Sequence, residues 1–545
     1  MNAQAMRDGW WAGSREQALA TLAPGGAEPG ALSGIGGGIT GAGILREAAR
    51  RGLRCLLVER QDFAWGTSSR SSKMVHGGLR YLGSGQLGLT RDSVRERQRL
   101  LDEAPGLVDV LHFFMPHYKG QFPGPRLFGM VLSVYDRLAG QRNHEFYRPA
   151  DTAQWMPGLR QDSLLGGTRF ADAVTDDARL VMRVLDEARG DGALAFNYLA
   201  ATALRTTEGR VSGVRLVDQL TLHSYEVRAR VVVSATGAWT DQLRAELGAE
   251  AAIRPLRGSH LVFPFWRLPV ACTLSFFHPR DRRPVFIFPW EGTTVVGTTD
   301  LDHAEDLNRE AAITEQEVGY LLEAVAYALP GSALTRADIQ CTWAGVRPVV
   351  GGSASDPSKE KREHAIWDDQ GLISVAGGKL TTFRLIALDV LKAAATYLPQ
   401  AAAEGSPQVF RPVEMPPRPA LVSAAQWRRL CGHYGTRVRE MLDLPLQSVT
   451  GSDTLWAELA WAASHESVQH LDDLLLRRTR LGLLLPEGAQ DQQTRLRALV
   501  QTRLGWSDAH WDAEWARYVR LWQRHYSVPT VQADTPVTAQ VEHTV

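Results

Sequence analysis

GGGITGAGILREAARRGLRCLLVE, residues 36–59, is the stretch that decides the fold. It combines a glycine turn, an alanine-rich helical pattern, the helix-stopping Gly52 and an apolar strand from Leu53 to Glu59. This order is typical of a β-turn-α-β unit, which spans about 30 residues. The sequence therefore predicts an α/β fold built around this unit.

The glycines of this stretch have the spacing of a dinucleotide-binding turn, with Gly36, Gly38 and Gly41 as G-x-G-x-x-G. The first permits the tight turn, the second lets a pyrophosphate approach the backbone, and the third lets the helix pack closely on the strand. The phosphates then face the helix N-terminus, whose free N–H groups favour anions. Glu59 follows Gly41 by 18 residues and can accept hydrogen bonds from a ribose.

The strand before this turn departs from the expected pattern. A buried parallel strand is continuously apolar, but Ala31–Ile35 includes Ser33 and Gly34. We expect either a sheet that tolerates a weak first strand or an altered register at this segment.

A second polar, glycine-rich segment, residues 66–82, favours FAD over a nicotinamide cofactor. Its small hydroxyls and backbone amides suit a pyrophosphate and an isoalloxazine ring. Met74, Val75 and Leu79 give it apolar anchors that a solvated, serine-rich loop would not need. We expect non-covalent FAD, because the motifs place no His or Cys against the ring's 8-methyl group, with only His76 as a candidate.

Composition narrows the class of protein. The 545 residues carry 60 basic and 60 acidic side chains, so no overall field attracts nucleic acid, and only six of the basic residues are lysine. The four cysteines are scattered without metal-ligand spacing, so we expect no metal site and a reducing compartment, with Cys55 buried as a small apolar residue. No stretch approaches 18 apolar residues and the N-terminus lacks a secretory pattern, which predicts a soluble or peripherally attached protein.

The rest of the chain divides into segments of different character. Residues 1–30 are an extension with a short helical pattern from Arg15 to Leu22, 401–419 are a proline-rich linker, and 531–545 are a polar tail. Helical patterns fill 420–530, to about Tyr526. A second, more antiparallel sheet is expected from the strand-like runs Leu194–Leu204, Val211–Val217, Val227–Ser234, Val285–Phe288, Thr293–Thr298 and Leu372–Ala376.

Seven motifs then occur in order along the chain. They are Gly36–Gly43, Ser71–Leu82, Ala235–Trp239, Arg257–His260, Gly297–Asp300, Gly345–Pro348 and Gly377–Thr382. Over roughly residues 33–530 the sequence resembles the FAD-dependent, aerobic-type glycerol-3-phosphate dehydrogenases. The resemblance implies a Rossmann-like (glutathione-reductase-type) FAD domain over 31–400, interleaved with an antiparallel-sheet substrate domain (roughly 105–170 and 245–340), and an α-helical C-terminal domain.

The resemblance also implies an activity. It is the oxidation of sn-glycerol 3-phosphate to dihydroxyacetone phosphate by hydride transfer to FAD, with electrons passed to a quinone. The resemblance further implies a cytoplasmic location on the inner face of the cytoplasmic membrane, and it is compatible with a homodimer. The implied FAD contacts are Gly36, Gly37, Gly38, Ile39, Thr40, Gly41, Glu59, Thr67, Ser68, Ser72, Lys73, His76, Gly77, Gly78, Gly237, Gly378, Lys379, Leu380 and Thr381.

The implied substrate pocket suits this chemistry. It consists of Arg80, Tyr81, His260, Arg347, Arg362 and Lys379. Arginines from three separate segments would bind a phosphate with charge-assisted bonds. Lys379, at a strand end, would stabilise charge on the reduced flavin or orient the substrate hydroxyl. His260 suits a general base, but the sequence leaves open whether it only binds the substrate. We take His260, Lys379, Arg347 and Arg80 as the candidate catalytic residues.

Other functions remain in competition. A flavin enzyme of the same fold could oxidise an amino acid or a 2-hydroxy acid, or pass its electrons to oxygen. A non-catalytic nucleotide-binding scaffold is a further alternative. In a polyanion binder, the arginines of Leu474–Arg480 would make the contact, but we interpret this run as a solvated helix face.

Overall fold

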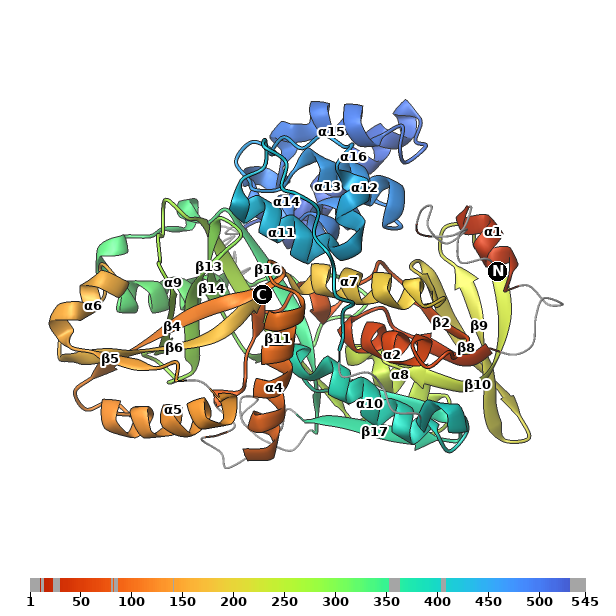
Figure 1. Cartoon of the computed structure of the whole chain (residues 1–545), viewed down its shortest axis with the longest axis horizontal. Coiled ribbons are helices and arrows are strands. Elements are labelled where there is room, and N and C mark those ends of the chain that lie inside the picture. Colours follow the sequence, from red (N-terminus) through yellow and green to blue (C-terminus); the bar gives the residue numbers. More distant parts are fainter. Residues whose placement is uncertain are drawn as a thin grey trace, which may run out of the picture.

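A computed structural model describes residues 10, 14–22, 30–79, 82, 87–140, 142–351, 363–402 and 408–529. Two β-sheets lie side by side beneath a layer of C-terminal helices (Figure 1). In chain order the strands alternate between the two sheets, so the units that the sheets define are interleaved.

The first sheet has eight strands and a parallel centre. Its main path is β17 (His364–Asp369), β18 (Leu372–Gly377), β10 (Ser224–Ser234), β1 (Gly30–Ile35), β2 (Cys55–Val58) and β7 (Leu194–Phe196). From β18 to β7 each neighbour is parallel, and the antiparallel β8 (Leu199–Thr207) and β9 (Arg210–Asp218) extend the sheet from β10.

Helices α2 (Ile39–Ala49), α7 (Asp177–Gly190) and α10 (Phe383–Ala394) cover one face of this sheet (Figure 1). Val231 and Val233 of β10 pack into the core on that face. Val232 packs into the core on the other face, with residues of β8, β9, α1 (Arg15–Ala20) and α8 (Thr240–Ala245). Strands that are apolar on both faces are those that a parallel sheet buries.

Strand β1 forms in full despite its polar composition. Ser33 pairs with Val232 and Leu56, and the register on both sides is regular from Leu32 to Ile35. The first of the two expectations is therefore confirmed: the sheet tolerates this strand, because apolar neighbours pair with it on both edges.

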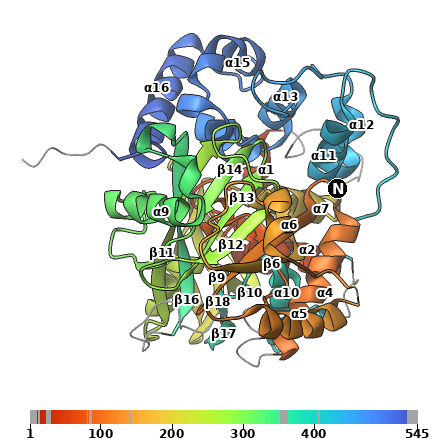
Figure 2. The same ribbon diagram turned by 90° about the vertical axis from the view of Figure 1, so that its left-hand side faces the viewer.

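The second sheet has ten strands and is antiparallel except for the β12–β4 pair. Its path is β15 (Leu301–Asp302), β11 (Ile253–Pro264), β14 (Thr293–Gly297), β13 (Pro284–Trp290), β12 (Thr273–Phe277), β4 (Val108–Tyr118), β6 (Leu164–Thr175) and β3 (Met74–Val75). β16 (Cys341–Val350) pairs with β11, and β5 (Glu145–Tyr147) with β6. Helices α4 (Leu87–Glu103), α5 (Pro125–Ala139), α6 (Pro149–Trp155) and α9 (Glu315–Ala328) accompany it (Figure 2).

The strand-like runs formed strands as predicted, but four were placed in the wrong sheet. Val285–Phe288 and Thr293–Thr298 contribute to the second sheet. The runs at 194–204, 211–217, 227–234 and 372–376 belong to the first. The physical reason is that β10 and β18 are apolar on both faces, which suits burial between layers beside β1.

The C-terminal region is helical, as the sequence predicts. Its helices are α11 (Ala424–Tyr434), α12 (Val438–Met441), α13 (Trp456–His465), the π-helical η9 (Asp473–Arg478), α14 (Leu481–Leu484), α15 (Gln493–Val500) and α16 (Asp508–His525). The described part of the linker, 408–419, has no helix or strand. The division into domains at the stated boundaries stays a prediction.

The interpretation of Leu474–Arg480 as a solvated helix face is wrong. Arg477, Arg478 and Arg480 are each 1% exposed, and Leu474 is part of a hydrophobic core. Aspartates from distant segments neutralise these arginines, which makes their burial possible.

The remaining composition-based expectations concern cysteines and membranes. All four cysteines are buried thiols with no disulfide among them, and burial raises the pKa of Cys55 to about 12, so its role as a buried apolar residue is confirmed. Within the described ranges, no helix has both the length and the apolar character needed to cross a bilayer. Nor do these ranges hold a cluster of three or more His, Cys, Asp and Glu suited to a metal ion.

Candidate active site

The glycine turn between β1 and α2 is closely packed. A Cβ atom on Gly41 would lie 1.9 Å from the Gly36 carbonyl oxygen, so only glycine allows this helix-to-strand contact. The Gly37 N–H donates to the Glu59 carboxylate (2.7 Å), and the Ile39 N–H donates to Ser68 Oγ (3.0 Å). The turn Gly36–Gly41, including Thr40 in the first turn of α2, thus lies against both Glu59 and Ser68.

Glu59 is held at the end of β2 by backbone donors. Its second carboxylate oxygen accepts the Gln61 N–H (2.9 Å). Burial raises the pKa of the Glu59 carboxyl, although the N–H groups of Gln61 and Gly37 oppose that shift. A half-buried acceptor beside a helix N-terminus is suited to hold the hydroxyls of a nucleotide ribose.

The loop after the short helix η1 (Thr67–Ser69) connects the glycine turn to the second sheet. Thr67 donates a hydrogen bond to the Val346 carbonyl, and Ser72 Oγ lies 2.8 Å from His260 Nε2. Two predicted cofactor residues are therefore in direct contact with the strands that carry two predicted substrate residues.

Lys73 lies in this loop, but its ammonium group is already bound within the protein. It is fully buried and donates to the Asp177 carboxylate (2.9 and 3.0 Å) and to the Ser69 carbonyl (2.6 Å). Burial lowers the pKa of Lys73 to about 8, although Asp177 opposes that shift. The Lys73 backbone is also bound within the protein, since its N–H donates to Ser71 Oγ (3.1 Å) and its carbonyl accepts from the Thr175 N–H (2.8 Å). Lys73 therefore supports the loop, and its contact with FAD stays a prediction.

The segment His76–Gly78 reaches the turn that follows β18. The His76 carbonyl accepts a hydrogen bond from Thr381 Oγ1 (3.1 Å), and the Gly77 N–H donates to Asp172 (3.0 Å). Gly77 also lies against Tyr135, whose Oη would be 2.1 Å from a Cβ at that position. The structure thus brings together two predicted cofactor segments whose bonded residues are 305 positions apart in the sequence.

Arg347 and His260 lie on the same face of neighbouring strands. In the β11–β16 register Leu256 pairs with Arg347, Gly258 with Gly345, and His260 with Trp343. The Arg347 guanidinium lies over Gly258, because a Cβ there would be 2.2 Å from it. Since alternate residues of a strand face the same side, the cation and the imidazole share one surface.

The His260 ring is enclosed and neutral. It is 1% exposed and stacks on the Trp343 ring at 4.9 Å between centroids. Its Nδ1 atom is buried and has no hydrogen-bond partner within the described residues. Burial, reinforced by the cations Arg347 and Lys73, lowers the pKa of His260 well below its ordinary value. A neutral imidazole is the form that accepts a proton.

Arg347 is held in place by the segment after β14. Its guanidinium donates to Asp300 (2.9 Å), to Thr298 Oγ1 (3.0 Å) and to the Thr299 carbonyl (3.3 Å). The side chain remains 22% exposed. A fixed and partly exposed guanidinium is suited to bind a phosphate or a carboxylate.

Lys379 lies at the carboxyl end of β18, as predicted. It is the residue before η6 (Leu380–Thr382), which includes Leu380 and Thr381 and leads into α10. Gly378, just before it, has φ +77°, a conformation that favours glycine. Gly237 lies near the same region, since a Cβ there would be 3.9 Å from Pro348. Arg80, Tyr81 and Arg362 lie outside the described residues.

Three residues of this site were missed at the sequence level. Trp343 stacks beneath His260, Asp300 orients Arg347, and Asp177 binds the loop at Ser71 and Lys73. Asp300 ends the motif Gly297–Asp300, whose spacing does not indicate a contact with Arg347. Trp343 and Asp177 have no local signal, because their partners are remote in sequence.

Comparisons with known proteins define the class. The FAD dependent oxidoreductase family matches residues 35–387, and the C-terminal domain of alpha-glycerophosphate oxidase matches residues 391–511. The fold and the glycine turn agree with this match. The chain is therefore an FAD-dependent oxidoreductase with the α/β, antiparallel and helical parts that its sequence predicts.

Individual relatives define the family within that class. "Glycerol-3-phosphate dehydrogenase 2" of Mycobacterium tuberculosis is 36% identical over 516 residues, covering 89% of this chain and 86% of that protein. The aerobic glycerol-3-phosphate dehydrogenase of Staphylococcus aureus is 33% identical over 477 residues, covering 82% and 86%. The glycerol-3-phosphate dehydrogenase of Bacillus halodurans, solved with FAD, has a TM-score of 0.75 at 27% identity and covers 95% of this chain and 99% of that one. The chain belongs to the family of FAD-dependent glycerol-3-phosphate dehydrogenases.

The residues present fit FAD. The Gly36, Gly37 and Ile39 N–H groups of the turn are bound within the protein, so a pyrophosphate would face the remaining N–H groups at the start of α2. Glu59 offers a half-buried acceptor to a ribose. The orphaned Nδ1 of His260 adds a polar atom beside the loop at Ser72.

Proposed function

We propose that the protein oxidises sn-glycerol 3-phosphate to dihydroxyacetone phosphate and passes the electrons to a quinone. The observation that carries this proposal is the pairing of a neutral, buried His260 and a fixed Arg347 on one strand face, in contact with the cofactor loop. The relatives are named glycerol-3-phosphate dehydrogenases, which supports glycerol 3-phosphate as the substrate.

When bound, FAD supplies an acceptor for the hydride that leaves C2 of the substrate. Arg347 would bind the phosphate and so fix the position of C2. With Nε2 of His260 donating to Ser72, the imidazole keeps a buried acceptor at Nδ1 that no described residue binds. We assign the proton of the C2 hydroxyl to the His260 imidazole, while the Trp343 ring and the surrounding strands keep water from it.

Anaerobic mixing tests the substrate. Glycerol 3-phosphate should bleach the visible absorbance of the bound flavin, whereas amino acids and 2-hydroxy acids at equal concentration should not. If only one of those acids bleaches the flavin, the protein is instead a flavin enzyme of the same fold that oxidises an amino acid or a 2-hydroxy acid. Reoxidation by a short-chain quinone without hydrogen peroxide supports the quinone; fast reoxidation by oxygen that yields peroxide would contradict it.

Replacing Lys379 by Met is expected to slow flavin reduction by about tenfold or more, equivalent to about 1.4 kcal/mol of transition-state stabilisation. The change keeps an apolar stem and removes the charge at the end of β18, so FAD should still bind through 36–41. Lys379→Arg should also be impaired if the site needs a compact charge. Lys392→Met, at an exposed position of α10, is the matched control. Stopped-flow reduction of Lys379→Met at the parent rate would make Lys379 a structural turn residue.

A quinone acceptor requires access to lipid, and α5 offers a surface for it. Phe128, Leu132 and Tyr135 of this helix are buried, yet Met130 and Val134 on its outer side are 61% and 43% exposed. A helix that keeps apolar side chains on its outer side as well as on its buried side suits a membrane surface. Both views place α5 at the end of the molecule opposite the C-terminal helices (Figures 1 and 2).

The charges of α5 favour an anionic bilayer. Its one acidic residue, Asp136, is buried and binds His144 (2.6 Å), whereas Arg126 and Arg137 are exposed. Phe122, in the loop just before the helix, is 71% exposed. We therefore propose that the protein binds the inner face of the cytoplasmic membrane through α5.

The double variant Met130→Ser, Val134→Ser is expected to lower binding to vesicles with anionic lipid by roughly tenfold or more, since each lost apolar side chain contributes on the order of 1 kcal/mol. Co-sedimentation with vesicles measures it. The control is Leu222→Ser, Leu421→Ser, two exposed leucines in connecting segments elsewhere. Equal losses in both double variants, or binding independent of lipid charge, would exclude α5 as the membrane surface.

A further inference from the structure

Three buried arginines at the end of η9 bind two loops of the cofactor site. Arg477 and Arg478 end this π-helix, and Arg480 follows two residues later with φ +61°. A π-helical turn and a left-handed arginine are both unusual backbone conformations. Here they allow three arginines within four positions to reach aspartates on different elements of the FAD-binding part.

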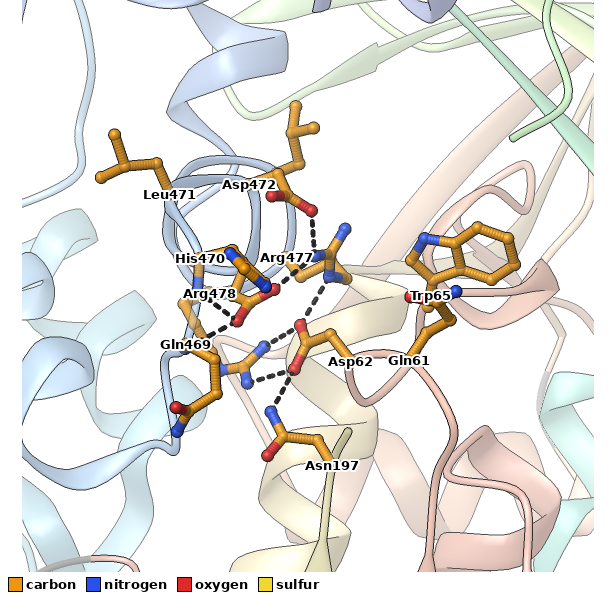
Figure 3. Close-up of polar contacts among 12 residues, drawn as sticks. Gln61, Asp62, Trp65, Asn197, Gln469, His470, Leu471, Asp472, Arg477 and Arg478 are labelled. Atoms are coloured by element: carbon orange, nitrogen blue, oxygen red, sulfur yellow. Dashed lines mark hydrogen bonds and ion pairs between the residues drawn. The ribbon is translucent and has the colours of Figure 1, made fainter. Parts of the chain in front are cut away.

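The first contact is with Asp62, in the segment after β2 (Figure 3). Asp62 accepts hydrogen bonds from Arg477 Nε (2.5 Å) and from two nitrogens of Arg478 (2.7 and 2.8 Å). Asn197 donates to the same carboxylate (2.9 Å). Burial alone would raise the pKa of Asp62, but Arg478 and Arg477 hold it below its ordinary value.

Asp62 lies directly behind the nucleotide end of the site. Its neighbour Phe63 packs on Gly37, since a Cβ there would be 2.8 Å from the Phe63 ring. The Ala64 N–H donates to the Gly37 carbonyl (3.0 Å), and the Gly37 N–H donates to Glu59. The segment that Arg477 and Arg478 hold is therefore the one that positions Glu59 and the glycine turn.

The second contact is with Asp177, behind the other loop. Arg480 donates to the Asp177 carboxylate, to Asp176 (3.0 Å) and to the Ser69 carbonyl (3.2 Å). Asp177 in turn accepts from the N–H and hydroxyl of Ser71 (3.0 and 2.7 Å), and from Lys73. Ser72 lies between these two residues and contacts His260.

The geometry points to Arg477, Arg478 and Arg480 as positioning residues for the cofactor. We propose that Arg477 and Arg478 fix the loop at the adenosine half of FAD, that Arg480 fixes the loop at the flavin half, and that the C-terminal helices thereby determine FAD affinity. This proposal rests on the FAD fold and is independent of the substrate and the acceptor.

The test is a titration of the apoprotein with FAD, followed by the quenching of flavin fluorescence. Arg480→Met and Arg478→Met should each raise the dissociation constant of FAD by about tenfold or more. The matched control is Arg429→Met. Arg429 of α11 also joins the C-terminal helices to a sheet, through Glu291 after β13 (2.7 Å), and it binds Glu458 of α13 (2.7 Å). None of its described bonds reaches the two loops. Arg429→Met should change the dissociation constant of FAD by no more than about twofold from the wild-type value, even if it lowers the thermal unfolding temperature.

ADP, the adenosine half alone, separates the two loops. Arg478→Lys, which keeps the charge but loses the paired bonds, should weaken both ADP and FAD. Arg480→Lys should weaken FAD and leave ADP binding unchanged. These lysine variants also serve if a methionine variant fails to fold. The proposal would be overturned if the variants at Arg478 and Arg480 left the dissociation constant of FAD unchanged. It would also be overturned if Arg429→Met weakened FAD binding as much as they do. In either case these arginines would be structural ion pairs only.

Discussion

His260→Asn is expected to slow anaerobic flavin reduction by about 100- to 10,000-fold, the range in which a general base contributes. Asparagine retains a polar group that Ser72 can contact, but it cannot take the C2 hydroxyl proton. FAD should still bind, because the substitution leaves the glycine turn and Glu59 unchanged. Stopped-flow absorbance at saturating substrate measures the rate. His278→Asn, which removes another buried histidine, just after β12, is the control.

A small effect would contradict this role. A loss of only about tenfold is the size of one hydrogen bond and would make His260 a substrate-binding residue. The pH profile gives a second readout. The neutral ring is the active form, and burial together with Arg347 and Lys73 lowers its pKa. The wild-type rate should therefore hold as the pH falls through 6.5, the ordinary value of histidine, and decline only below it, whereas His260→Asn should lack this decline.

Arg347→Ala is expected to weaken use of glycerol 3-phosphate by about 10- to 150-fold, since one charge-assisted bond to phosphate contributes roughly 1.5–3 kcal/mol. Slow oxidation of glycerol, which has no phosphate, should change far less. The ratio of kcat/KM for the two substrates measures the difference. Arg254→Ala is a matched control, because this arginine also lies on the second sheet but pairs with Asp302 at an exposed edge. Equal losses on both substrates would place Arg347 outside the phosphate site.

Local features were predictable from the sequence. The glycine turn, α2 and β2 lie within 24 residues, and their conformation depends on glycine sterics and apolar periodicity. Motif order located His260, Arg347 and Lys379 on strands or strand ends, although their roles remain predictions. Strand assignment to sheets failed for 194–234 and 372–376, because pairing depends on neighbours far along the chain.

Ion pairs between residues far apart in the chain were the feature that the sequence predicted least well. The arginine run at 474–480 looked solvated, since a charge on a helix is usually exposed. Its burial depends on Asp62 and Asp177, which the sequence does not connect to it. Lys73 shows the same limit: its place in the cofactor loop was clear, but its bond to Asp177, 104 residues away, was not.

The bond between Arg477 and Asp62 spans 415 residues, and this has a consequence for biosynthesis. A ribosome adds about 5–20 residues per second, so the nucleotide-binding loop waits about 20–80 s for its partner. During that interval the nascent N-terminal unit contains Asp62, whose counter-charges Arg477 and Arg478 do not yet exist. On the positioning role proposed above for Arg477 and Arg478, the segment behind the glycine turn reaches its final arrangement only after the C-terminal helices are made, and the full affinity for FAD belongs to the finished chain.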